Sequence, residues 1–183
     1  MTVGFREVDE KRREWRRLPA KRRKLDMDEL LFPVVVGPKE KLYILDHHHL
    51  ALALLGEGAK EVQAGTVCDL SDLSLDDFWV FLDHRSWVHC YDATGERRGF
   101  DKIPKTFAAM TDDPYRSLAS SVQKLGGYAK PSEPFLEFLW ANHFRRAISR
   151  RKVEDDFERA LAEALELARQ PSSAHLPGWA GPK

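Results

Sequence analysis

The sequence has few of the features that assign a function directly. Its 183 residues include only two cysteines, Cys68 and Cys90, and no C-x-x-C pair, which excludes a cysteine-rich zinc site and a disulfide-stabilised scaffold. No run approaches the ~20 apolar residues that span a bilayer. The basic N-terminus also lacks the apolar segment of a secretory signal. We therefore expect a soluble, cytoplasmic protein with no membrane partner.

The chain also has no excess of charge of either sign. Its 29 Lys and Arg residues balance 29 Asp and Glu residues, so the net charge predicts no partner. The distribution is uneven, because residues 11–24 contain nine basic residues and one acid, and residues 145–152 contain five basic residues and no acid. Such runs can bind phosphate, although basic residues on helices are more often a solvated face. Both interpretations stay open.

What the sequence does contain is enough apolar material for an ordinary core. Hydrophobic residues make up 43% of the chain and five residues are tryptophan. This length suits a domain that folds without disulfides or a structural metal. The composition therefore indicates a globular protein, whose function has to be sought in local motifs.

The first half of the sequence predicts a small sheet with helices. Residues 2–18 predict a short strand that leads into a charged helix. Residues 33–36 and 42–45 are β-rich runs separated by a short loop, which is typical of a hairpin. A helix then begins after Asp46, which we expect to be its N-cap. Residues 60–70 return as a strand of the same sheet.

The second half predicts mainly helices. Ser74 is a capping candidate for the helix that follows it, and residues 93–96 predict the turn of a second hairpin. Pro114 marks another helix start. The strongly apolar segment 134–149 predicts a further helix. We therefore expect an α+β fold, in which a small mixed sheet with helices is followed by a mostly helical C-terminal half.

Three consecutive histidines, His47, His48 and His49, follow Asp46 directly. Consecutive helical residues point about 100° apart, so the three rings cannot face one point on a helix. The i, i+4 spacing of a helical zinc pair is absent as well. An ordinary structural role, with one ring packed, one solvated and one in the turn, is favoured over a metal site.

The position of these histidines is more informative than their number. A strand that runs into a helix N-terminus directs backbone N–H groups and a positive dipole end at one spot, which suits an anion. A neutral imidazole in that first turn can act as a general base near pH 7. The segment therefore suits phosphate chemistry better than a structural metal.

Two further segments hold candidate site residues. Asp83 could orient a histidine such as His84, with Arg85 beside them, or the segment is only a basic helix end. Asp113 and Arg116 lie at a predicted helix entrance, where the aspartate can cap the helix. Arg116 could hold a phosphate or pair with the neighbouring acids, and the acids slightly favour pairing.

Several motifs together resemble a known family. The run "ILDHHHLALAL" with "GEGAKEVQAGTVCDLS" after it is similar to the core of the ParB/sulfiredoxin fold. "TVGFREV", "DDPYRSLA" and "PFLEFLWA" resemble the branch described as ParB-like nucleases. The resemblance covers residues 1–150 and implies one nuclease domain there. An amphipathic helix over residues 151–170 and a loose tail over residues 171–183 would follow it.

The resemblance carries over residue by residue. Asp46 matches the family aspartate, and His47 stands where glycine is usual. His48 and His49 match a polar pair, which is Cys-His in sulfiredoxin, so sulfinic-acid repair is not expected here. Leu50 stands where a phosphate-holding arginine is expected, and the loss of such a contact costs about 1.5–3 kcal/mol.

The resemblance implies a nuclease or a phosphate-transfer enzyme that acts on DNA or a nucleotide at residues 46–49. His48 or His49 would be the general base, with Asp46 orienting it or holding a divalent Mg²⁺ or Mn²⁺ ion. Arg85 and Arg116 are the candidates for phosphate charge. The alternative is a non-catalytic module that binds DNA or a protein, with structural histidines, because fold does not settle chemistry.

Overall fold

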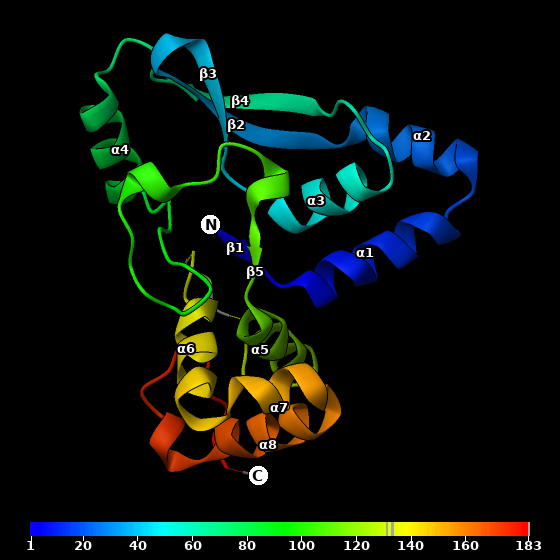
Figure 1. Ribbon diagram of the computed structural model, residues 1–183, viewed down its shortest axis with the longest axis vertical. Helices are drawn as coiled ribbons and strands as arrows, with labels where there is room; N and C mark the ends of the chain where they lie inside the picture. Colours follow the sequence, from blue (N-terminus) through cyan, green and yellow to red (C-terminus); the bar gives the residue numbers. More distant parts are fainter. Residues whose placement is uncertain (131, 133, 183) are drawn as a thin grey trace. The chain divides into compact units, whose positions relative to one another are not determined.

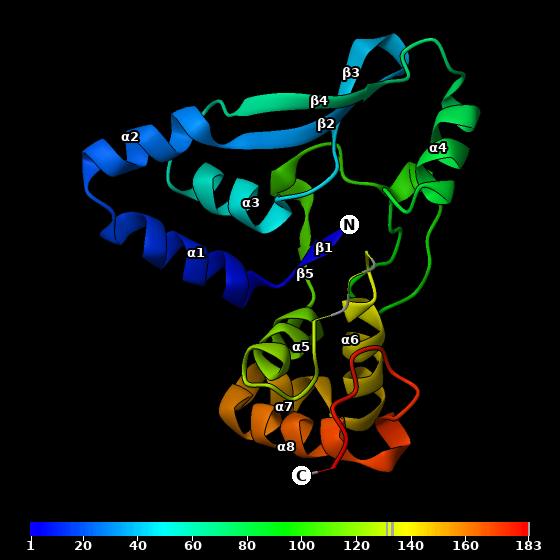
Figure 2. The same cartoon turned by 180° about the vertical axis from the view of Figure 1, so that it is seen from behind.

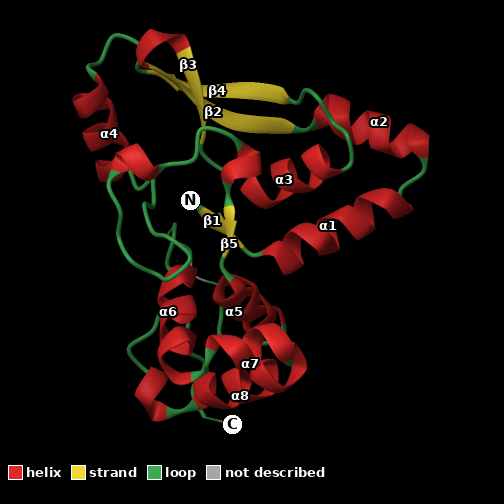
Figure 3. Ribbon diagram, in the orientation of Figure 1, coloured by secondary structure: helices red, strands yellow, loops and turns green. Residues whose placement is uncertain are grey.

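The computed structural model describes residues 1–130, 132 and 134–182 and confirms a mixed α+β fold (Figures 1 and 3). The chain divides into two compact units. The first holds Met1 and residues 6–90 and 97–110, and the second holds residues 2–5, 91–96 and 111 onward. This division differs from the single domain expected over residues 1–150, because buried side chains of the C-terminal helices form a core of their own.

The first unit is built on a three-stranded sheet with the order β3-β2-β4. The central strand β2 (Leu31–Gly37) is antiparallel to β3 (Lys41–Ile44) and parallel to β4 (Gln63–Asp69). The short helix η1 (Pro38–Glu40) joins β2 to β3. Both the predicted hairpin and the third strand of the same sheet are thereby confirmed.

Helix α3 (His48–Gly56) follows β3 and provides part of the crossover between the parallel strands β2 and β4. Its Ala51 and Leu54 pack against Phe32 of β2 in an apolar cluster. Leu50 contributes to the same cluster although it is only partly buried. This packing fixes where the helix begins, and so positions the three histidines.

Two helices precede the sheet, α1 (Phe5–Arg17) and α2 (Ala20–Glu29). Helix α1 lies beside α3 in both ribbon views (Figures 1 and 2). Arg12 and Arg16 of α1 bind the carboxylate of Glu57 just after the end of α3, each at 2.7 Å. These hydrogen bonds and charges lower the pKa of Glu57 to about 2. The carboxylate therefore stays ionised, and paired with both arginines, at any pH well above that value.

Helix α4 (Leu75–His84) packs Phe78 and Leu82 against Val35 of β2. The predicted cap is confirmed, because the Ser74 hydroxyl oxygen accepts from the Asp77 N–H at 3.1 Å. The predicted second hairpin is reduced to one turn, in which the Asp92 N–H donates to the carbonyl of Glu96 at 3.0 Å. Two short helices follow this turn, η2 (Phe100–Lys102) and η3 (Phe107–Ala109).

The second unit is mainly helical. The short strands β1 (Thr2–Val3) and β5 (Thr111–Asp112) pair in parallel. The helices that follow are α5 (Pro114–Lys124), α6 (Glu137–Ala147), α7 (Arg150–Asp155) and α8 (Phe157–Arg169). The helix expected over residues 151–170 is therefore two helices. They meet at Asp156, whose side chain accepts from the Arg159 N–H and begins α8.

The C-terminal tail, which we expected to be loose, is packed up to residue 179. It begins with η4 (Pro171–Ser173), and the side chain of Leu176 is buried in the core of the second unit. The indole N–H of Trp140 donates to the carbonyl of Pro177 at 2.8 Å. Its polar, proline-rich composition suggested a loose segment, whereas two apolar anchors, Leu176 and Trp179, decide its packing. Lys183 lies outside the described residues.

No helix among the described residues is long and apolar enough to cross a bilayer.

Candidate functional site

The segment from Asp46 to His49 forms the turn between β3 and α3. His47, and not Asp46, is the N-cap of α3, and no side chain caps this helix. The prediction for Asp46 was wrong, because its carboxylate accepts from the N–H of the next residue, His47, at 2.6 Å, and not from an N–H inside the helix. The turn is thus closed by Asp46, and the helix start remains without a side-chain cap.

The backbone of His47 has a left-handed conformation, with φ 67° and ψ 22°. Glycine adopts this conformation without the steric cost that a Cβ atom brings. The glycine that the family resemblance expects at this position would fit this conformation. Here the imidazole makes an edge contact with the ring of Phe32, at 5.7 Å between centroids, which partly compensates for the strained turn.

The three histidines contact three different neighbours. His47 lies against Phe32, His48 lies edge-on to Phe107 at 6.2 Å, and His49 faces Glu7. They do not converge, as helical geometry predicts. Within residues 1–130, 132 and 134–182, no group of three or more His, Cys, Asp and Glu side chains is placed to hold a metal ion.

The contact between His49 and Glu7 is the most informative feature of this turn. Nε2 of His49 lies 3.0 Å from Oε2 of Glu7, and the two side chains are only 20% and 22% exposed. A carboxylate at that distance accepts the Nε2 proton and fixes the ring orientation. The carboxylate beside His49 is thus Glu7, whereas Asp46 accepts from the His47 N–H.

Sequence reasoning did not find Glu7. It lies in the first turn of α1, a helix rich in charged residues, and nothing in its local pattern separates it from its acidic neighbours. The anchor of Arg12 and Arg16 on Glu57 lies at the other end of α3. Contacts at both ends thus hold α1 along α3 and keep Glu7 beside His49.

The segment around Asp83 is arranged differently from the prediction. Asp83 pairs with Arg97 at 3.5 Å, and does not contact a histidine through a hydrogen bond or ion pair. His84 is the exposed last residue of α4. The guanidinium of Arg85 lies over the ring of Trp87, at 5.0 Å from its centroid. These side chains remain on the surface of the first unit.

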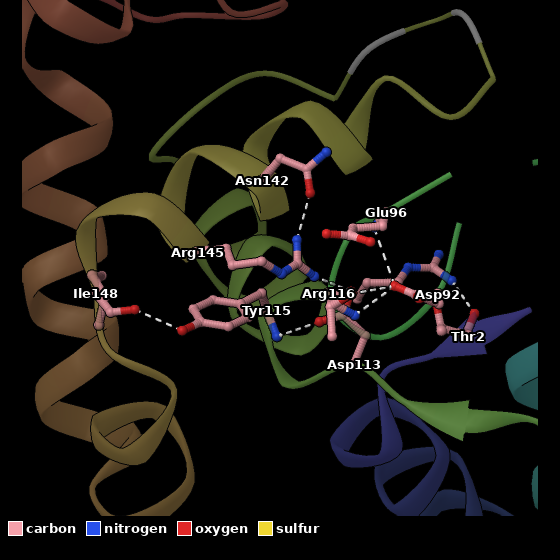
Figure 4. A network of polar contacts seen from close by, with 10 residues as sticks. Thr2, Asp92, Glu96, Asp113, Tyr115, Arg116, Asn142, Arg145 and Ile148 are labelled. Atoms are coloured by element: carbon pink, nitrogen blue, oxygen red, sulfur yellow. Dashed lines mark hydrogen bonds and ion pairs between the residues drawn. The ribbon is translucent and has the colours of Figure 1, made fainter. Parts of the chain in front are cut away.

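Asp113 and Arg116 belong to the second unit, where both make structural contacts (Figure 4). Asp113 caps α5 by accepting from the Tyr115 N–H at 3.1 Å, and it pairs with Arg145 at 2.5 Å. Burial raises the pKa of Asp113, while the charge of Arg145 opposes this shift. The carboxylate is thus committed to a buried ion pair.

Arg116 is also engaged within this unit. It donates to the carbonyl of Thr2 at 2.5 Å, and its guanidinium lies 4.0 Å from the ring centroid of Phe138. A weaker ion pair joins it to Glu137 at 3.8 Å. Arg116 therefore ties the first strand of the chain to α5 and α6, which is a positioning role.

The comparisons with known proteins identify the family. A family model described as "Putative ParB-like nuclease" matches residues 1–146. The chain belongs to this family. Its structure is similar to the crystal structure of protein Atu1540 from Agrobacterium tumefaciens, with a TM-score of 0.93 and 46% identity over 100% of this chain and 92% of that chain. No match was found among curated proteins.

The extent of the ParB-like match bears on the candidate residues. It spans the whole first unit and the second unit as far as α6, so the turn at residues 46–49, Glu7 and Arg85 all lie inside it. Helices α7 and α8 lie beyond its end. The match to the ParB-like family therefore covers all of the candidate site residues.

Proposed function

We propose that this ParB-like protein hydrolyses a phosphodiester bond of DNA or a phosphate bond of a nucleotide at the start of α3. His49 is the general base and Glu7 orients it. The observation that carries the proposal is the 3.0 Å contact between these two side chains at a strand-to-helix turn. Family membership adds nuclease chemistry to the reasons for testing this site.

The reaction follows from the orientation of the ring. With Nε2–H donated to Glu7, a neutral His49 carries its lone pair on Nδ1 and can take a proton from water. The water oxygen attacks phosphorus, the bond from phosphorus to the leaving oxygen breaks, and that oxygen is protonated by solvent. The carboxylate of Glu7 stabilises the imidazolium that forms. His48 is the second candidate for the base.

The same turn offers electrostatic support for a phosphate. Four N–H groups at a helix start have no partner within the helix, and the dipole is positive there. Asp46 supplies one exposed carboxylate, and Mg²⁺ is commonly held by one or two carboxylates together with substrate phosphates. A Mg²⁺ or Mn²⁺ ion at Asp46 is therefore part of the proposal. Arg85 is the residue of the first unit that we propose to neutralise the phosphate charge.

The second candidate function is a non-catalytic module that binds DNA or a protein. Leu50 favours it, because this side chain packs in the apolar cluster around Phe32 at the position where the family resemblance expects an arginine for phosphate. In that case the contact of Glu7 with His49 serves only to attach α1 to α3.

One assay separates the two functions. The full chain is incubated with single- and double-stranded DNA, and separately with ATP, ADP and CTP, in the presence of Mg²⁺, Mn²⁺, Zn²⁺ or EDTA. His49→Ala is expected to lower the rate about a hundredfold or more, the range of general base catalysis. His84→Ala, which changes an exposed histidine of the same unit, is the matched control and should leave the rate unchanged.

Activity that survives both His49→Ala and His48→Ala would overturn the catalytic assignment. DNA binding with no turnover under any metal condition would instead support the binding module. Turnover that EDTA does not affect would remove the metal ion from the proposal and leave the histidine assignment standing.

A further inference from the structure

Helices α1 and α2 carry the longest basic run of the chain, nine Lys and Arg residues between positions 11 and 24. Three of them are neutralised inside the first unit. Arg12 and Arg16 share the carboxylate of Glu57, and Arg22 pairs with Asp26 at 2.7 Å. The ion pairs within the first unit explain why these three positions are basic.

The other six Lys and Arg residues of this run have no such partner among the described residues. Within the described part of the chain they make no ion pair and no side-chain hydrogen bond, and four of the six are exposed. We call this set the basic arm. It consists of Lys11, Arg13, Arg17, Lys21, Arg23 and Lys24.

The exposed members of the basic arm lie close together on their helices. Arg13 and Arg17 are four residues apart on α1, and Lys21 and Lys24 are three residues apart on α2. At these spacings side chains are neighbours on one helix face, and like charges repel. In the described part of the chain none of these four side chains forms an ion pair with a carboxylate, so each can pair with an external anion.

The second basic run of the chain provides a comparison. Four of its five members are neutralised by carboxylates of the second unit: Arg145 by Asp113, Arg150 by Glu154, Arg151 by Asp155 and Lys152 by Glu163. Two runs that look equivalent in the sequence thus differ in the fold. Only the run on α1 and α2 keeps most of its charge available.

We infer that the basic arm binds the phosphate backbone of double-stranded DNA. The inference rests on the proposed function in taking DNA as the partner of this unit. Three of the six side chains are arginines, whose planar guanidinium groups match phosphate geometry. Contacts of this kind are independent of base sequence and depend steeply on salt.

The composition of the arm favours duplex DNA over other anionic partners. Trp15 is the only aromatic residue of the segment, and it packs in the core, so no ring is available to stack on unpaired bases. Met27 of α2 and Leu30, the residue that follows the helix, also contribute to that core. The arm thus lacks the apolar face with which an amphipathic helix enters a membrane surface.

The test measures binding of a fluorescein-labelled DNA duplex by anisotropy over a range of salt concentrations, with no divalent metal present. Arg13→Gln/Arg17→Gln and Lys21→Gln/Lys24→Gln each remove two charges of the arm. Each is expected to lower the slope of log K against log salt by about 1.8, which corresponds to about 60-fold weaker binding near 0.1 M salt. Arg150→Gln/Arg151→Gln removes two charges from α7 and is the matched control.

Unchanged binding in both arm variants, or an equal loss in the control, would overturn the inference. Tighter binding of the wild-type protein to vesicles containing phosphatidylserine than to the duplex would overturn it as well. The melting temperatures of the arm variants should change little, because the four side chains are exposed and form no ion pair with the described residues. Binding is measured without turnover and without divalent metal, so a failure of the catalytic proposal is distinguishable from a failure of the arm.

Discussion

His49 at the start of α3 is held by Glu7 in the first turn of α1, with Nε2 and Oε2 3.0 Å apart. The two residues are far apart in the sequence, and the anchor of Arg12 and Arg16 on Glu57 holds the same two helices together at their other ends. A histidine in a strand-to-helix turn thereby acquires a fixed orientation. The consequences of this arrangement and of three others can be measured.

Replacing the carboxylate tests the orienting role of Glu7. In Glu7→Gln the side chain keeps its size, but it loses the negative charge beside His49. We expect the rate of phosphate hydrolysis to fall about tenfold or more, less than for loss of the base itself. Steady-state kinetics measures this effect.

Glu14→Gln on the same helix is the control for this variant, because Glu14 is exposed. A Glu7→Gln protein with an unchanged rate would show that the contact only attaches the helices. If Glu7→Gln fails to fold, as circular dichroism would show, the contact between Glu7 and His49 is likewise structural.

The left-handed conformation of His47 predicts a stabilising substitution. His47→Gly removes the Cβ atom that opposes φ 67°, and it should stabilise the fold by about 1 kcal/mol. His47→Ala keeps the Cβ atom and loses the contact with Phe32, so it should be less stable than wild type. Urea unfolding compares the three proteins. A loss of hydrolysis in His47→Gly would contradict our assignment of the base to His49.

The buried pair of Arg145 and Asp113 predicts a large effect on stability. Asp113 is 3% exposed, so Arg145→Ala leaves a buried carboxylate without its cation and should cost about 3–5 kcal/mol of unfolding free energy. The double variant Asp113→Asn/Arg145→Met removes both charges and keeps a capping residue, so it should lose much less. Denaturant unfolding measures both variants.

The control for this pair is Arg146→Ala, an exposed neighbour whose loss should change stability by about 0.5 kcal/mol or less. Equal losses for Arg145→Ala and Arg146→Ala would mean that Asp113 finds water or another cation.

His143 makes the stability of the second unit dependent on pH. Its Nε2 lies 2.9 Å from the Ser173 oxygen, and burial, with help from His175 and Arg146, lowers its pKa. The unfolded chain then binds a proton more readily than the folded one, so the free energy of unfolding should fall as pH drops below about 6.5. Above that value this residue should contribute no pH dependence.

Urea unfolding followed by tryptophan fluorescence over this pH range measures the effect. His143→Gln removes the titration and should flatten the stability profile between about pH 6.5 and the lowered pKa. His84→Gln, at an exposed position, should leave the profile as in wild type. An unflattened profile in His143→Gln would assign the pH dependence to other groups.

Local patterns were sufficient for much of the fold. The hairpin of β2 and β3, the strand β4 and the cap at Ser74 follow from residue types whose effects act within a few positions. The divergence of the three histidines also follows from the geometry of one helix turn. Family motifs within residues 1–150 predicted the family that the comparisons identify.

Contacts between distant residues could not be predicted in this way. The sequence contains 29 acidic side chains, and only the packing of α1 along α3 selects Glu7 as the one at His49. The same holds for the two basic runs, since ion pairs formed in the fold neutralise one and leave the other charged. Local composition misplaced the tail for the same reason, because Leu176 and Trp179 find their apolar partners only in the assembled core. The sequence thus determined the elements and the chemistry available at the turn, while tertiary packing decided which charged groups meet.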